Sequence, residues 1–246
     1  MNFKTADTDM LHGPLTKKIL LFTLPIALSS ILQQLFNAAD TAVVGYFGNK
    51  DALAAVGNNT EIIALIVTVS SGLSVGANIL VAGLIGKGRR EEIPFAVRTS
   101  VVMAVIIGIS GMISGQFAAE PLLRLIQAPE NILRDATLYL RIYFLGMPGS
   151  MLYNFGAAVL RGVGDTRRPL IFLFFAGIVN VGLNLLLVIQ FNLSVAGVGI
   201  ATVVSQYISA ALVLWCMLKT DGCYHIVLKE PVSYTHLRAH ETRHDL

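Results

Sequence analysis

The sequence predicts an all-α membrane protein with six transmembrane helices, and two observations lead to this fold class. Hydrophobic residues make up 54% of the 246 residues and charged residues only 13%, which is about half the charged fraction of a soluble domain. The charges also cluster, and they leave five long uncharged runs, at residues 19–39, 62–86, 99–119, 142–160 and 169–218. Because a spanning helix needs roughly 20 residues, the last run is long enough for two helices.

We therefore expect helices at residues 17–44, 53–86, 95–118, 133–160, 169–190 and 194–218. We expect Pro25 to interrupt the first helix and Pro148 to interrupt the fourth. Proline lacks the backbone N–H that a helix uses, so Pro25 is a candidate helix hinge. Small residues at close-packing spacing, such as Gly72 with Gly76 and Gly111 with Gly115, predict tight contacts between helices.

The expected organisation is one six-helix membrane lobe, residues 14–220, between an N-terminal segment, residues 1–13, and a loop, residues 221–230. Residues 231–246 resemble translated adapter read-through, and we exclude them from fold reasoning. The natural protein then continues past this point. The segment from His240 to His244 matches the H-E-x-x-H zinc motif, but it ends two residues from the terminus with no domain around it. We expect no metal site.

The distribution of Lys and Arg predicts the orientation. Nine of them fall on one side of the expected membrane: Lys4, Lys17, Lys18, Lys87, Arg89, Arg90, Arg161, Arg167 and Arg168. Three fall on the other side: Lys50, Arg124 and Arg134. The positive-inside rule places both termini in the cytoplasm of a multi-pass inner-membrane protein surrounded by membrane lipid. The net charge of +3 is a topology signal, and no basic stretch with interleaved aromatic residues indicates nucleic acid.

Asp40 is the only acidic residue of the apolar stretch 19–48. A carboxylate at membrane depth is costly and usually has a function. Gln33, Asn37 and Asp40 are spaced i, i+4, i+7, which puts them on one helix face. This polar stripe predicts the internal cavity of a transporter; the alternative is a structural polar contact between two helices. Since His12 is the only histidine before residue 219, no Ser/His/Asp set can be assembled, and we expect no enzyme.

Several segments are similar to the N-terminal half of a multidrug and toxic compound extrusion (MATE) transporter. They read LPIALSSILQQLFNAADTAVVGYFG, SVGANILVAGLIGKGRREE, AAVLRGVGDTRRPL, NVGLN and GVGIATVVSQ. The similarity covers essentially all of residues 10–220, and LRGVGDTRRP is its most specific part. It implies a twelve-helix fold of two lobes around a central cavity. This chain supplies one lobe, and the missing C-terminal lobe is its expected partner.

The resemblance also implies a cation-coupling network, with members Asp40, Tyr139, Asn180, Asn184 and Thr202. At 1.5 Å per residue, Asn180 and Asn184 lie about 18–24 Å along their helix and share one face. Many family members carry a carboxylate where this chain has Asn184, so coupling through two carboxylates is in doubt. The alternatives are an interfacial anchor for Tyr139 and a bond from Thr202 to its own helix backbone.

The expected function is antiport, in which organic cations or drugs leave the cell in exchange for protons or sodium ions. A low-dielectric surrounding favours the neutral form of a carboxylate, which lets Asp40 exchange a proton. The exchange would bend the first helix at Pro25. Candidate contacts for the substrate are Gln33, Gln34, Asn37, Tyr143, Met147, Met151 and Phe155.

Three other readings stay open. Glu61 is a candidate second acid, or it is a solvated residue near the start of its helix. A lipid-linked oligosaccharide flippase would need a more cationic cavity, for which Arg141 is the candidate. A fragment that transports nothing is the third possibility. Apart from the coupling ion, no cofactor is expected.

Overall fold

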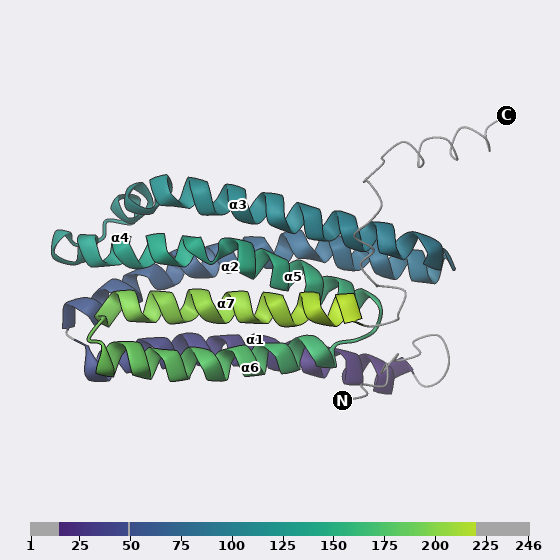
Figure 1. Cartoon of the computed structure of the whole chain (residues 1–246), viewed down its shortest axis with the longest axis horizontal. Helices are drawn as coiled ribbons and strands as arrows, with labels where there is room; N and C mark the ends of the chain where they lie inside the picture. The colour runs from purple at the N-terminus through teal and green to yellow at the C-terminus, as the bar shows by residue number, and fades with distance from the viewer. Residues whose placement is uncertain (1–14, 49, 220–246) are drawn as a thin grey trace.

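The computed structural model describes residues 15–48 and 50–219 and folds them into a helical bundle (Figure 1). The helices are α1 (Leu15–Phe47), α2 (Lys50–Gly86), α3 (Ile93–Leu125), α4 (Glu130–Leu145), α5 (Met147–Gly162), α6 (Arg167–Leu185) and α7 (Ser194–Lys219). A 3-10 turn, Arg90–Glu92, precedes α3, and a π-helical turn, Leu186–Gln190, follows α6. All the α-helices run along the long axis, and α1 begins at the same end of the bundle at which α7 ends.

Five helices are long and apolar enough to cross a membrane: α1, α2, α3, α6 with its π-turn, and α7. The expected helix at residues 133–160 is interrupted, as Pro148 predicted, and it forms two separate helices. Two helices of 16 residues each, α4 and α5, follow one another along the bundle and meet at Gly146. Pro148 explains the interruption, because it has no N–H to donate to the carbonyl four residues earlier. The all-α membrane fold is confirmed, and α4 with α5 takes the place of the expected fourth span.

The hydrophobic core lies among α2, α3, α4, α5 and α7. Gly111 and Gly115 confirm the predicted close contacts, since α3 packs there against the side chains of Met147 and Phe144. The same prediction is wrong for Gly72 and Gly76, around which no other described atom lies within 4 Å of an added Cβ.

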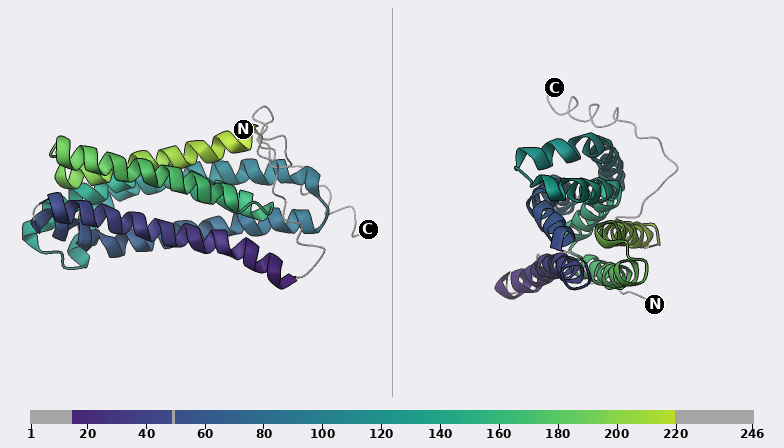
Figure 2. Two further views of the ribbon diagram at one scale, coloured as in Figure 1. Left: turned by 90° about the horizontal axis from the view of Figure 1, so that it is seen from below. Right: turned by 90° about the vertical axis from the view of Figure 1, so that its left-hand side faces the viewer.

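Two helices form a separate flank of the bundle. Seen along its axis, α1 and α6 lie side by side, apart from α3 and α4 (Figure 2). Only 6% of the most apolar part of α1 is buried, against 39% of the corresponding part of α7. The helix that carries Asp40 is therefore the least enclosed of the five long helices.

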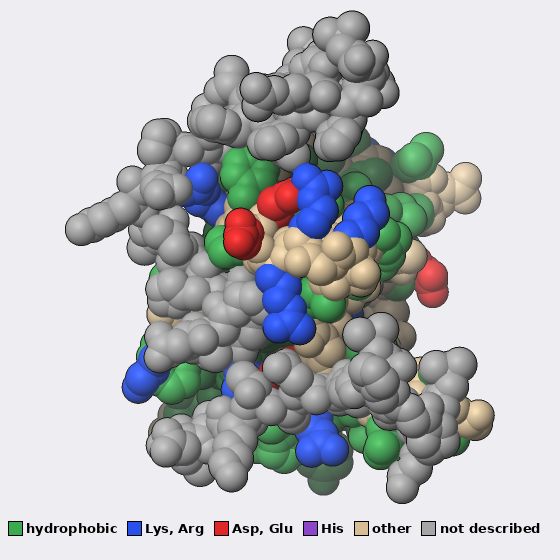
Figure 3. All heavy atoms as spheres, turned by 90° about the vertical axis from the view of Figure 1, so that its right-hand side faces the viewer, with side chains coloured by type: hydrophobic (Ala, Val, Ile, Leu, Met, Phe, Trp, Pro, Cys, Tyr) green, Lys and Arg blue, Asp and Glu red, His purple; other side chains and the backbone are tan. Residues whose placement is uncertain are grey.

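Positive charge is concentrated at one end of the bundle. Figure 3 shows Lys and Arg side chains gathered on the end where the α2–α3 and α5–α6 connections lie. Within the described part of the chain, these connections and the adjoining helix ends carry Lys87, Arg89, Arg90, Arg161, Arg167 and Arg168. The connections at the other end and their adjoining helix ends carry Lys50, Arg124 and Arg134. Lys4 and the tail with its zinc-like motif lie outside the described residues.

Candidate functional site

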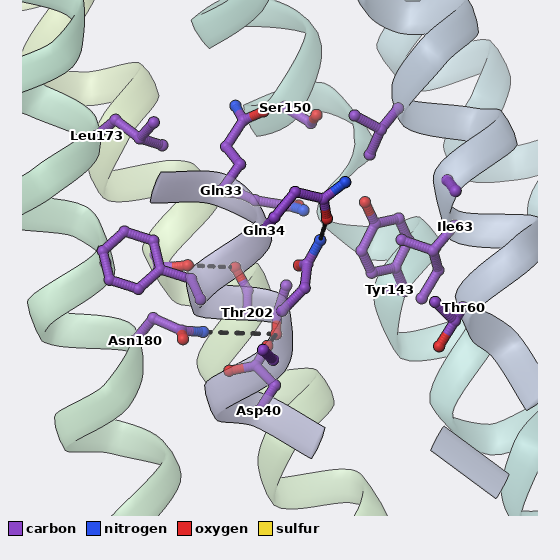
Figure 4. Close-up of a pocket in the computed structure, with 18 of the residues that line it drawn as sticks. Gln33, Gln34, Asp40, Thr60, Ile63, Tyr143, Ser150, Leu173, Asn180 and Thr202 are labelled. Carbon is purple, nitrogen blue, oxygen red and sulfur yellow. Dashed lines mark hydrogen bonds between the residues drawn. The ribbon is translucent and has the colours of Figure 1, made fainter. Parts of the chain in front are cut away.

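A polar cleft of about 660 Å³ opens between α1, α2, α4, α5, α6 and α7. Figure 4 shows Gln33 and Gln34 of α1 and Tyr143 of α4 around this space, with Asp40 near Thr202 and Asn180. Every one of the six helices contributes polar side chains, among them Gln33, Gln34, Asn37, Asp40, Thr60, Glu61, Tyr139, Tyr143, Ser150, Asn154, Asn180, Thr202 and Gln206. Among the described residues, no Lys, Arg or His lines the cleft, and its acidic residues are Asp40 and Glu61.

The side chains implied by the family resemblance meet at Asp40, which is only 5% exposed. Asn184 Nδ2 donates to Asp40 Oδ1, and Thr202 Oγ1 lies 3.2 Å from Asp40 Oδ2. Asn184 Nδ2 is also 3.4 Å from Asn180 Oδ1, and Asn180 Nδ2 is 3.5 Å from Thr202 Oγ1. Tyr139 is buried beside Asp40 and Thr202 and lines the same cleft. The five residues therefore form one cluster contributed by α1, α4, α6 and α7.

Thr202 can serve Asp40 in two ways. Its Oγ1 is 2.9 Å from its own helix carbonyl, Val198 O, and 3.2 Å from Asp40 Oδ2. A hydroxyl has one hydrogen to donate, so it donates to one of these acceptors at a time. When it donates to Val198 O, its lone pairs can accept a hydrogen bond from a protonated Asp40. The hydrogen bond from Thr202 to its own helix backbone is therefore compatible with its contact to Asp40.

Asn184 offers a further oxygen atom. Its Oδ1 is buried without a hydrogen-bond partner, next to the carboxylate that its Nδ2 contacts. A buried acceptor without a donor is unfavourable and therefore calls for an explanation. A small cation at this point would have the oxygens of Asp40, Asn184 and Thr202 as ligands. No group of three or more His, Cys, Asp and Glu residues occurs in the described part of the chain, so a transition-metal site is not indicated there.

Local sequence explains how α1 and α6 come close enough to build the cluster. A Cβ at Gly177 would overlap the ring of Phe36, so this glycine lets α1 lie directly against α6. Asn180 and Asn184 follow on the same face of α6, one turn apart. The π-turn Leu186–Gln190 begins two residues after Asn184, and π-helical turns are frequent at functional sites. The small residue at Gly177 was a signal that the sequence analysis did not use.

The predicted substrate contacts separate into two groups. Gln33, Gln34, Asn37 and Tyr143 line the cleft. Met147, Met151 and Phe155 are buried in the core and are not among the lining residues. The Cε of Met147 lies 2.7 Å from where a Cβ of Gly111 would be, so this side chain packs on α3. The methionines occupy the face of α5 that points away from the cleft.

Other cleft residues were missed. They are polar residues on helices that are otherwise apolar: Thr60, Ser150, Tyr153, Asn154, Ser205, Gln206 and Ser209. Helical spacing was the available signal, because Ser150 and Asn154 lie four apart and Thr202, Ser205, Gln206 and Ser209 follow one stripe of α7.

The predicted hinge lies far from the cluster. Pro25 is inside α1, which continues as a helix on both sides of it, and Ser29 Oγ donates to Pro25 O at 2.8 Å. Fifteen residues separate Pro25 from Asp40, about 22 Å at 1.5 Å per residue. Arg141 is exposed and does not line the cleft.

Known proteins show the same sequence pattern and fold. A probable multidrug resistance protein of Bacillus subtilis, YpnP, is 30% identical over 211 residues, which are 86% of this chain and 47% of that protein. A solved MATE structure in the bent conformation matches with a TM-score of 0.87 at 25% identity, covering 95% of this chain and 52% of the other. A second, with a TM-score of 0.84 and 25% identity, covers 96% of this chain and 52% of its own. It is a transporter of the MOP superfamily from Pyrococcus furiosus, described as having a binding pocket of reverse polarity that suggests a different function.

These matches fix the family and the extent of the chain within it. The chain spans about half the length of the curated relatives it matches, consistent with a single lobe. Its spanning helices and its relatives make it a multi-pass membrane protein. The family model MatE matches residues 25–186, more than half of the sequence. The chain therefore belongs to the MATE family, multidrug and toxic compound extrusion transporters, and represents one lobe of such a protein.

Proposed function

We propose that this chain is one lobe of an antiporter that exports organic cations or drugs in exchange for protons or sodium ions. The observation that supports this most is the enclosed carboxylate of Asp40, which borders a cleft open to larger molecules. Its oxygens are contacted by Asn184 and Thr202. The Thr202 hydroxyl can either donate to Asp40 or accept from it. Asp40 can therefore exchange a small ion without a change in the positions of its neighbours.

The chemistry of the cluster suits either coupling ion. Protonated Asp40 can donate to Thr202, which then donates to Val198 O. Sodium would instead be held by carboxylate, amide and hydroxyl oxygens, including the unpartnered Oδ1 of Asn184. Where many family members have a second carboxylate, this chain has the amide Asn184. Asp40 is therefore the only carboxylate of the cluster that can exchange the coupling ion.

The cleft supports a cationic substrate. Its volume of about 660 Å³ falls within the range of about 300–1,000 Å³ that is usual for sites of drug-sized molecules. Two carboxylates and several aromatic rings line it, and no basic residue of the described chain does. A flippase for anionic lipid-linked sugars is not favoured, because its one cationic candidate, Arg141, lies outside the cleft.

Movement of α1 is the proposed link between ion and substrate. Asp40 ties α1 to α6 and α7 through Asn184 and Thr202. Loading the carboxylate with a proton or sodium ion weakens its attraction for the amide donor of Asn184, and α1 is otherwise little buried. Pro25 is the point at which α1 lacks a backbone hydrogen bond, and there we place the bend.

We place the basic end of the bundle in the cytoplasm, in accordance with the positive-inside rule. The protein would then lie in the cytoplasmic membrane with both ends of the lobe inside. The relatives are about twice as long as this chain. Their other half would form a second lobe that covers the exposed side of α1 and completes the central cavity. The working unit is the two-lobed protein.

The test is transport by the complete, two-lobed protein in vesicles with an imposed proton or sodium gradient. Asp40→Asn keeps the size and hydrogen bonding of the side chain and removes the charge, so gradient-driven efflux should fall to background while the protein still inserts and folds. Asn184→Asp should be tolerated better, because it adds an acid that relatives carry.

Asp51→Asn is the matched control, because it makes the same chemical change on an exposed residue outside the cleft and should leave efflux unchanged. Wild-type transport by Asp40→Asn under both gradients would show that Asp40 is structural and that coupling occurs elsewhere.

A further inference from the structure

We propose that Glu61 binds the positive charge of the exported molecule, while Asp40 binds the coupling ion. This rests on the proposed function and goes beyond it, because it assigns the two carboxylates of one cleft to two different ligands.

The surroundings of the two acids are opposite. Asp40 is 5% exposed, and Asn184 and Thr202 occupy both of its oxygens, which leaves room for a proton or a small ion only. Glu61 is exposed and lines the cleft from α2. Within the described part of the chain, no side chain forms an ion pair or a hydrogen bond with it. A bulky ammonium group can reach Glu61 and cannot enter the cluster around Asp40.

Glu61 lies along α2 at about the level of Asp40. It is the twelfth residue of α2, about 16 Å from the start of that helix at 1.5 Å per residue. Asp40 lies about 10 Å from its own end of α1, and the two helices are joined by a short connection, so Glu61 is at least as deep as Asp40. An ionisable residue at membrane depth usually faces a cavity and has a partner there.

The neighbours of Glu61 suit the apolar body of an organic cation. Thr60 and Ile63 lie on the same wall, and Figure 4 shows Tyr143 of α4 close to them. Aromatic faces attract ammonium groups, and Tyr143 would add to the attraction of the carboxylate. Since no base of the described chain lines the cleft, no internal cation competes for Glu61. The ligand class is therefore an organic ammonium or amidinium attached to an apolar body.

The experiment measures binding and coupling separately, in the complete two-lobed transporter. Ethidium is the probe, its dissociation constant is measured by fluorescence in detergent, and its gradient-driven efflux is measured in vesicles. Glu61→Gln should raise the Kd for ethidium by roughly two- to fivefold, the range for one exposed charge pair. Efflux at saturating ethidium should keep its dependence on the ion gradient.

Glu61→Asp keeps the charge and should leave the Kd for ethidium close to the wild-type value, below the increase caused by Glu61→Gln. Glu120→Gln is the control, because Glu120 pairs with Arg124 at the same end of the lobe and does not line the cleft. It should change neither the Kd nor the coupling.

Three results would overturn the proposal. The first is an unchanged Kd in Glu61→Gln. The second is loss of gradient dependence in Glu61→Gln, whatever its Kd, which would make Glu61 part of the coupling site. The third is increased binding of anionic fluorescein by Glu61→Gln without weaker ethidium binding, which would mean that a base of the second lobe neutralises Glu61. If Asp40→Asn keeps its gradient dependence while Glu61→Gln binds ethidium weakly, the coupling role of Asp40 fails and the role of Glu61 stands.

Discussion

Pro25 and Pro148 lie in helices of the same lobe, and the chain behaves differently at each. At Pro25, α1 continues as a helix; the proline itself is buried, while Leu24 and Leu28 on the other face are 57% and 43% exposed. Around Pro148, the chain is interrupted between α4 and α5 and is packed on two sides. Gly108 of α3 touches the proline backbone, and Tyr207 Oη of α7 donates to Leu145 O at 2.9 Å.

The difference shows that proline alone decides neither the break nor the motion of a helix. Both prolines remove one backbone hydrogen bond. At Pro148, α3 and α7 fix the interrupted geometry. Pro25 is buried, but it lies in a continuous helix of which only 6% of the most apolar part is buried, so α1 as a whole is little held by the rest of the lobe. We therefore expect α1 to move in transport and the α4–α5 junction to act as the fixed part against which it moves.

The largest expected effect comes from filling the contact that fixes the junction. In Gly108→Ala, the new Cβ would lie 2.6 Å from the Pro148 Cα, which is backbone and cannot rotate away. We expect a loss of about 2 kcal/mol in the free energy of unfolding, the usual cost of overpacking. Thermal unfolding in detergent checks this. Gly83→Ala, in α2, is the matched control: no atom lies within 4 Å of its added Cβ, so its stability should stay level or rise by up to about 1 kcal/mol.

An unchanged melting temperature for Gly108→Ala would mean that the α3–junction contact is loose. The proposed division into a fixed junction and a movable α1 would then lose its support.

The next effect is on transport. Pro25→Ala restores an N–H that can bond the carbonyl of Leu21, four residues earlier, and this adds about 1 kcal/mol to the cost of bending α1. A bending step that limits turnover would become roughly fivefold slower, with the melting temperature unchanged. Efflux rates at saturating substrate and thermal unfolding, both in the two-lobed protein, separate these two quantities.

Pro148→Ala should lower the stability of the protein, because straightening the α4–α5 junction would break its contacts with α3 and α7. We expect a lower melting temperature for this variant. Equal losses of stability in the two variants would contradict the comparison.

The sequence predicted the long helices of this protein, but it did not predict the geometry of the α4–α5 junction. The uncharged runs located all the long helices, because membrane-length apolar segments are a one-dimensional property of the chain. Pro148 predicted an interruption within run 142–160. The geometry of the junction at Gly146 could not be predicted, since it depends on Gly108 and Tyr207, which are distant in the sequence.

The site shows the same limit. Spacing placed Asn180 and Asn184 on one face of a helix, but only the family resemblance indicated that this face meets Asp40. Residue type favoured Met147 and Met151 as cavity contacts. The structure buries both outside the cleft and packs Met147 on α3, because the face that a helix presents to a given neighbour is set by tertiary packing.

The smallest expected effect concerns the bond between α7 and the junction. Tyr207→Phe removes the hydroxyl that donates to Leu145 O and keeps the ring. Because the net contribution of one hydrogen bond is about 1 kcal/mol and Tyr207 is 43% exposed, we expect a loss of about 0.5–1 kcal/mol. Tyr46→Phe is the control, since Tyr46 is 84% exposed at the end of α1 and its hydroxyl has no bond to another described residue. Combining Tyr207→Phe with Gly108→Ala gives the coupling energy between the two contacts. A non-additive result would show that α3 and α7 hold the junction together, and strict additivity would show that each contact acts on its own side of Pro148.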